Sequence, residues 1–147
     1  MVDILVKTFN QLSLEELYGI LKLRSDVFVV EQNCVYPDLD DKDQRAIHVI
    51  LKKNNIVIGY TRIFKPGDYF DQASIGRVVV SKTERHSQYG TKIMEVSIET
   101  IFKEYQTNSI KISAQVYLNN FYKNLGFIPI GNSYLEDGIP HIAMIKD

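Results

Sequence analysis

Residues 76–94 read Gly-Arg-Val-Val-Val-Ser-Lys-Thr-Glu-Arg-His-Ser-Gln-Tyr-Gly-Thr-Lys-Ile-Met, and this stretch decides the fold. The apolar run 78–80 is typical of a central strand that is buried on both faces. A polar turn over 85–90 follows, and apolar residues then recur at helical spacing, which predicts a helix over about 88–105. Such a junction leaves unpaired N–H groups and the positive end of the helix dipole at the helix N-terminus, where an anion is the natural ligand. The alternative is a polar turn that only caps the helix.

Upstream of this junction the pattern predicts a strand, a helix and a loop. Residues 2–8 are short, rich in β-branched side chains and followed by polar residues, as in a strand. Ser13 and Glu16 form a capping-box signature, and the apolar spacing after them predicts a helix over about 13–28. The segment 37–43 is so rich in ionisable residues that we expect a surface loop or a short helix.

The other elements complete a sheet with helices on both faces. Their expected ranges are strands 47–52, 56–64, 73–80, 110–114, 127–130 and 141–145, with a helix over 118–125 that Gly126 ends. The order β-α-β-β-β-α-β-α-β-β predicts an α/β (α+β) fold with a mixed, mostly antiparallel central sheet. We expect residues 1–147 to form a single domain.

Composition excludes several classes of protein. The 147 residues are 45% hydrophobic and 24% charged, with a formal net charge of -1, so the chain is not a nucleic-acid-binding polycation. No window approaches the roughly 18 consecutive apolar residues of a membrane span, and the N-terminus lacks the pattern of a signal peptide. The single cysteine, Cys34, cannot form an internal disulfide, which fits a reducing compartment. We therefore expect a cytoplasmic protein with no nucleic-acid or membrane partner.

Common cofactor motifs are absent. The acidic segment 38–43 lacks the glycine and the final glutamate of a calcium loop, and no two histidines lie within five residues of each other. Glycine-rich nucleotide motifs are also missing. We expect no metal site.

Two segments carry a family pattern at the right mutual distance. The pattern Arg/Gln-x-x-Gly-x-Gly/Ala falls on Arg85, Gln88 and Gly90, with glutamine in place of the first glycine. The second pattern, Asn-x-x-Ala-x-x-x-Tyr-x-x-x-Gly-Phe, falls on Gln115, Leu118, Tyr122, Gly126 and Phe127, with Gln115 in place of the asparagine and Leu118 in place of the alanine. Further signatures are Val27–Gln32, Gly76–Val80 and Glu136–His141. Through these segments the chain resembles the GNAT superfamily of N-acetyltransferases, and more closely its ElaA-like branch, over nearly its whole length.

The resemblance implies that acetyl-CoA binds as a co-substrate. Its pyrophosphate would lie on the backbone amides of residues 85–91, and its pantetheine arm would run beside 78–80 like an added strand. The implied cofactor-binding residues are Val78, Val79, Val80, Arg85, His86, Ser87, Gln88, Tyr89, Gly90, Thr91 and Gln115. A free N–H near Val78 or Val79 would stabilise the oxyanion that forms during acyl transfer. Without the family, core packing is the better interpretation of these valines, because runs of β-branched residues mostly pack.

The catalytic candidates are Tyr122, Glu31 and His141. In the family, the hydroxyl equivalent to that of Tyr122 protonates the departing CoA thiolate; the alternative is a tyrosine of the aromatic core. For the general base, Glu31 and His141 rank ahead of His48 and Asp137, and for each of these residues a structural role is the alternative.

Two positions depart from the family pattern or admit two roles. Gln88 stands where most relatives have glycine, and a side chain there is compatible with a donated N–H only if its φ is negative. Arg77 interrupts an apolar strand and could pair with a substrate carboxylate or with a carboxylate of the fold.

The resemblance implies an acetyl-CoA-dependent N-acetyltransferase in which a primary amine attacks directly within a ternary complex. The acceptor is a small-molecule or peptide amine, and the acidic residues within 28–43 and 134–141 would suit a cationic one. Relatives often form homodimers, so this state is expected as well. The alternative is a non-catalytic acyl-CoA-binding module that retains the fold.

Overall fold

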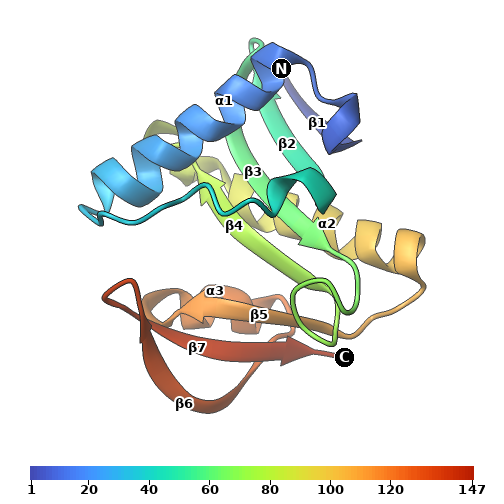
Figure 1. The fold of residues 1–147 in the computed structure, drawn as a ribbon, viewed down its shortest axis with the longest axis vertical. Helices are drawn as coiled ribbons and strands as arrows, with labels where there is room; N and C mark the ends of the chain where they lie inside the picture. The colour runs from blue at the N-terminus through green and yellow to red at the C-terminus, as the bar shows by residue number, and fades with distance from the viewer.

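A computed structural model describes residues 1–147, and its elements follow the predicted order (Figure 1). They are β1 (Val2–Thr8), α1 (Leu14–Arg24), β2 (Ile47–Lys53), β3 (Ile56–Phe64), β4 (Ser74–Val80), α2 (Tyr89–Tyr105), β5 (Ile110–Gln115), α3 (Asn119–Asn124), β6 (Ile128–Glu136) and β7 (Ile139–Lys146). None of the helices has the length and apolar character that a bilayer crossing requires.

The strands form two antiparallel sheets, one in the order β1-β2-β3-β4 and the other in the order β5-β7-β6. A parallel bridge joins them between Ala73 and Ile110, and the Lys111 N–H donates to the Ala73 carbonyl at 2.9 Å. Beyond this bridge β4 and β5 diverge. The prediction that 78–80 is buried on both faces is therefore wrong, because β4 loses one neighbour and leaves Val78 and Val80 only half-buried.

The two long helices cover opposite faces of the four-stranded sheet (Figure 1). Alternation along β2 shows this directly: Val49 and Leu51 pack in the cluster that contains Ile93 of α2, whereas Ile50 packs with Ile20 of α1. Side chains alternate between the two faces of a strand, and both faces of this sheet are covered by a helix. Successive residues of the central strands are therefore apolar.

A β-bulge in β4 reverses that alternation part of the way along the strand. Tyr60 lies opposite Val79 and Arg62 lies opposite Gly76, so Arg77 and Val78 together face Thr61. Arg77 has φ 49°, a left-handed conformation that costs a side chain about 1 kcal/mol. The bulge directs the Arg77 side chain toward the face covered by α1, where it meets carboxylates of the fold.

The boundaries of two predicted elements change. The helix expected over 13–28 ends as an α-helix at Arg24 and continues as a wider π-helical turn over Ser25–Glu31. The last two strands extend beyond 127–130 and 141–145 to a tight turn at Asp137 and Gly138. The sequence hid the extension because most of β6 is exposed and lacks apolar alternation.

The segment 37–43 is not the simple surface loop that its charge predicts. Three of its acids pair with arginines from α1, β3 and β4: Asp38 and Asp43 with Arg24, Asp40 and Asp43 with Arg62, and Asp38 and Asp40 with Arg77. Asp43 is buried, and Arg24 and Arg62 are at most 1% exposed. We call these six residues the arginine–aspartate network; the pairing charges allow an acidic segment to pack against the sheet.

The capping box at the start of α1 is present and belongs to a buried ion cluster. The Ser13 hydroxyl accepts from the Glu16 N–H at 3.0 Å, and the Glu16 carboxylate accepts from the Ser13 N–H at 2.9 Å. The ammonium groups of Lys7 and Lys52 lie 2.8 and 2.9 Å from the same carboxylate. Burial alone would raise the pKa of Glu16, but these hydrogen bonds outweigh it and lower the pKa to about 2.

Acid is expected to remove the stability that Glu16 contributes. Because the pKa of Glu16 is lower in the folded than in the unfolded chain, its contribution is complete above about pH 4.5 and is lost as pH falls toward 2. The loss in free energy of unfolding is at most about 3 kcal/mol. Denaturant titrations of the wild type and Glu16→Gln across this range would measure it. Glu16→Gln should make the free energy of unfolding less dependent on pH in this range. Glu15→Gln, at the exposed neighbouring position, should leave the pH dependence unchanged.

Candidate active site

A groove of about 510 Å³ lies along the diverging part of β4. Its walls come from the π-helical turn, β4, the first turn of α2 and the residues around α3. Most of the residues singled out from the sequence line it: Glu31, Val78, Val79, Val80, Arg85, Gln88, Gly90, Thr91, Gln115 and Tyr122. The groove therefore gathers residues from distant parts of the chain into one elongated site.

Three of the expected cofactor-binding residues do not line the groove. His86 and Ser87 are exposed on the loop before α2, and Tyr89 packs against the larger core cluster. Any contribution of Tyr89 to the groove is restricted to its backbone at the start of α2.

The open edge of β4 presents backbone groups to the groove. The Ser81 N–H donates to the Ile58 carbonyl of β3 at 2.7 Å. Because alternate residues of an antiparallel strand bond to the same neighbour, Val79 also faces β3, and Val78 and Val80 face the open edge. The Val80 carbonyl accordingly accepts from Arg85 Nε at 3.1 Å across that edge. Of the two expected oxyanion donors, Val78 is thus the better placed.

The condition of a negative φ, set for Gln88 from the sequence, is not met. Gln88 has φ 57° and ψ 28°, the left-handed conformation that glycine adopts easily. It stands immediately before α2, so the first N–H groups of the helix remain free of intrahelical partners. The chain therefore keeps the glycine-like turn at the helix N-terminus and accepts the strain of a side chain there.

Gln88→Gly is expected to raise the free energy of unfolding by up to about 1 kcal/mol. Glycine removes the strain of the left-handed conformation, and the greater freedom of the unfolded chain offsets part of that gain. Chemical denaturation of both proteins measures the difference. A loss of stability in the variant would mean that the Gln88 side chain makes a stabilising contact that outweighs the strain.

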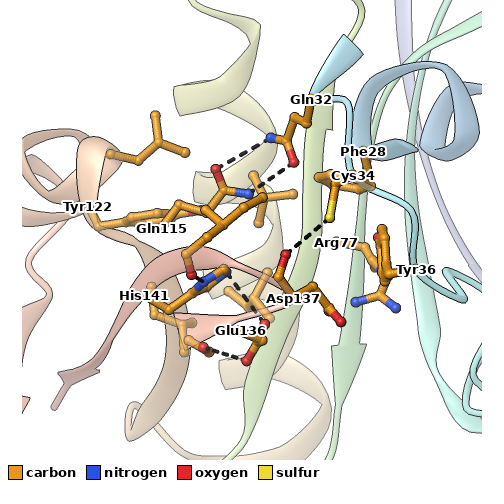
Figure 2. Close-up of a pocket in the computed structure, with 17 residues that line it drawn as sticks. Phe28, Gln32, Cys34, Tyr36, Arg77, Gln115, Tyr122, Glu136, Asp137 and His141 are labelled. Carbon is orange, nitrogen blue, oxygen red and sulfur yellow. Dashed lines mark hydrogen bonds and ion pairs between the residues drawn. The ribbon is translucent and has the colours of Figure 1, made fainter. Parts of the chain in front are cut away.

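A second, smaller cavity of about 110 Å³, which we call the inner cavity, lies beside the groove (Figure 2). The two share a wall formed by Phe28, Gln32, Val78, Gln115, Leu118 and Tyr122. The rest of its lining comes mainly from β4, β5 and the tip of the β6–β7 hairpin. Two molecules that enter from the two sides would thus meet at this shared wall.

Tyr122 is a buried residue of that shared wall. It is 5% exposed, and its hydroxyl makes no hydrogen bond within the protein. Burial raises the pKa of the Tyr122 phenol well above its usual range, and the proximity of Tyr117 adds to the shift. The hydroxyl is therefore a proton donor that stays protonated at neutral pH.

His141 lines the inner cavity from β7 with a fixed tautomer. Its Nδ1 lies 2.7 Å from the Ile139 carbonyl, which only accepts, so Nδ1 carries the proton and Nε2 is the basic atom of the neutral ring. The Glu136 carboxylate lies 3.4 Å from Nε2 (Figure 2). An imidazole in this position can take up a proton, and Glu136 stabilises the resulting cation.

Glu31 is in a different environment from a general base. It lines the groove but not the inner cavity, and its carboxylate pairs with both terminal nitrogens of Arg85, one at 2.7 Å. Hydrogen bonding to Arg85 lowers the pKa of Glu31 below its ordinary value. This arrangement favours a role in holding Arg85 over one in accepting a proton.

The other two candidates for the general base, His48 and Asp137, lie in different parts of the structure. His48 is buried against Tyr60 and the Asp43 carbonyl beside the arginine–aspartate network, outside both cavities, and burial lowers its pKa. Asp137 lines the inner cavity at the hairpin tip. Arg77 also reaches that cavity, but Asp38 and Asp40 hold its guanidinium, which decides between its two expected roles in favour of the fold's own carboxylates.

Several lining residues escaped the sequence analysis as site candidates. Gln32 and Gln115 exchange two long amide hydrogen bonds of 3.4 Å across the shared wall, and Cys34 donates to the Asp137 carbonyl at 3.3 Å (Figure 2). Gln32 and Glu136 lie within recognised signatures, so that signal could have found them. Tyr36 and Cys34 gave no comparable signal.

Comparisons with known proteins agree with this geometry. A family model described as an acetyltransferase (GNAT) domain matches residues 11–147. The chain is 41% identical to protein ElaA of Escherichia coli over 140 residues, covering 94% of this chain and 92% of that protein. Its structure is similar to that of an acyl-CoA N-acyltransferase from Pseudomonas aeruginosa, with TM-score 0.94, 34% identity and all of both chains covered. It is likewise similar to the crystal structure of Escherichia coli ElaA, with TM-score 0.93, 38% identity and all of both chains covered.

Proposed function

The chain belongs to the GNAT family of acetyltransferases, in its ElaA-like branch, and from this premise we propose that it is an acetyl-CoA-dependent N-acetyltransferase. A primary amine attacks the acetyl group directly while both substrates are bound. The observation that carries the proposal is the wall shared by the groove and the inner cavity, because direct attack requires donor and acceptor to meet there.

The groove suits acetyl-CoA in several respects. The free N–H groups at the start of α2 can hold a pyrophosphate, and the open edge of β4 can bond the amides of a pantetheine arm. A Cβ at Gly90 would stand 3.5 Å from Phe121 and 3.9 Å from Val80, both of which line the groove, so glycine keeps this end open. Arg85, at the same end, can offer its guanidinium to a phosphate.

The chain's own groups supply the remaining parts of the reaction. Bound acetyl-CoA supplies the thioester carbonyl that the amine attacks. The Val78 N–H donates to the oxygen that gains negative charge, and His141 Nε2 accepts the proton that the amine loses. Tyr122 donates its hydroxyl proton to the departing thiolate. Gln115 positions the bound acetyl-CoA at the shared wall.

Calorimetric titration with acetyl-CoA, using desulfo-CoA and ATP as controls, is the first test. We expect micromolar binding of acetyl-CoA that ATP does not match, followed by release of the CoA thiol when a suitable amine is added. Absence of binding up to millimolar acetyl-CoA would overturn the proposal, and binding without thiol release for any amine would favour a binding module.

A further inference from the structure

The inner cavity has two carboxylates in its wall that no lysine or arginine balances. Glu136 accepts from the Ser113 hydroxyl at 3.2 Å and lies beside His141, and the Asp137 carboxylate makes no ion pair or hydrogen bond in the protein. Arg77 is the only lysine or arginine in the lining, and Asp38 and Asp40 already hold it at 2.8 and 3.6 Å. The wall therefore carries an uncompensated negative charge.

The position of this charge is fixed by the fold. Asp137 and Gly138, with φ of 52° and 79°, form the tight turn of the β6–β7 hairpin. The bond from the Cys34 sulfur to the Asp137 carbonyl ties this turn to the segment after the π-helical turn (Figure 2). Glu136 and Asp137 are both exposed, so their carboxylates stand at the solvent side of the cavity.

The buried end of the cavity has a different character. Tyr122 and His141 are 5% and 7% exposed, and the Tyr122 hydroxyl lacks a hydrogen-bond partner in the protein although it lines the cavity. A hydroxyl on a side chain that is otherwise buried, open to a cavity and free of protein partners, is available to bond a ligand atom there. The cavity thus has a reacting end inside and an acidic end outside.

Its size limits what can lie between these ends. The inner cavity has a volume of about 110 Å³, against about 510 Å³ for the groove beside it. This space admits the terminus of an unbranched chain more readily than a branched carbon that carries two large substituents.

We propose that the acceptor is a linear primary amine with a second cationic group, which Asp137 binds at the solvent side of the cavity while the first amine reacts at Tyr122 and His141, beside Glu136. The proposal rests on the proposed function and specifies its acceptor. A carboxylate in place of the second cation would face two like charges and bind poorly.

A matched series of five-carbon acceptors tests the charge preference. Pentane-1,5-diamine, pentylamine and 5-aminopentanoic acid present the same reacting amine with a distal cation, no distal charge and a distal anion. With thiol release as the readout, we expect kcat/KM to fall by roughly tenfold from the diamine to the monoamine and further to the acid. Equal values, or a preference for the acid, would overturn the inference while leaving the proposed function intact.

Asp137→Asn tests whether the second cationic group of the acceptor binds at this carboxylate. Asparagine tolerates the left-handed conformation of the turn, so the hairpin is kept while the charge is lost. The variant should raise KM for the diamine by a larger factor than KM for pentylamine, and Asp3→Asn on exposed β1 should change neither. An unchanged diamine preference in Asp137→Asn would overturn the proposal. Failure of every amine to release thiol while acetyl-CoA binds would instead overturn the proposed function, and this inference with it.

Discussion

Tyr122→Phe is expected to lower the rate of amine acetylation about a hundredfold or more while acetyl-CoA affinity stays the same. The phenol is the donor placed at the shared wall, and a positioned general acid typically contributes factors of this size. Phenylalanine keeps the ring that packs against Phe121 and Phe127, so the fold and the groove should be retained. Steady-state thiol release and calorimetric binding measure the two quantities separately.

A tyrosine outside both cavities provides the control. Tyr18→Phe on exposed α1 removes the same atom and should leave both rate and affinity unchanged. A full rate in Tyr122→Phe would contradict the catalytic role of the hydroxyl and leave Tyr122 as a residue of the aromatic core. A wild type that binds acetyl-CoA but has no rate would identify the non-catalytic acyl-CoA-binding alternative.

Asp43→Asn is expected to reduce the free energy of unfolding by about 3–5 kcal/mol. One oxygen of this buried carboxylate accepts from both Arg24 at 2.8 Å and Arg62 at 2.9 Å. Removing its charge leaves two guanidinium groups in the interior with too few anions, and their desolvation is then no longer compensated. Urea titration at neutral pH measures the change.

The exposed pair Lys22 and Asp26 is the matched control. Both side chains are more than half exposed, so Asp26→Asn should change stability by less than about 1 kcal/mol. Comparable effects of the two substitutions would mean that the arginine–aspartate network contributes no more than a surface ion pair. The larger loss should also disturb the inner cavity, because Arg77 belongs to both the network and the cavity wall.

Features with a local periodic signal could be predicted from the sequence. The helix over 88–105 and the hairpin over 47–64 follow from the spacing of apolar residues, and the structure places them within a residue or two. The two family segments likewise indicated Tyr122 and Gln115, which the fold brings to one wall.

Features that depend on distant partners could not be predicted. The charge of 37–43 suggests solvent exposure until its arginines, which lie elsewhere in the chain, are known. Glu31 remained a base candidate because nothing near it in sequence indicates Arg85, 54 positions away. Neither Arg77 nor Gln88 is of a residue type that favours the left-handed φ that it has; at Gln88 the one signal was the glycine that most relatives have there, and at Arg77 there was none.

The bulge at Arg77 divides β4 into two halves that are out of phase. Before it, Ile75 packs with the α2 cluster, and after it, Val79 packs with the α1 cluster, although the two residues are four positions apart and would share a face in a regular strand. Deletion of this single codon would restore the regular alternation without turning 78–80 over, because Ile75 and Val79 would then be three positions apart and would still face opposite sides. A strand of the same length without the bulge would move the valine of the α1 cluster to the other face, so the length of this strand is as restricted as the identity of its residues.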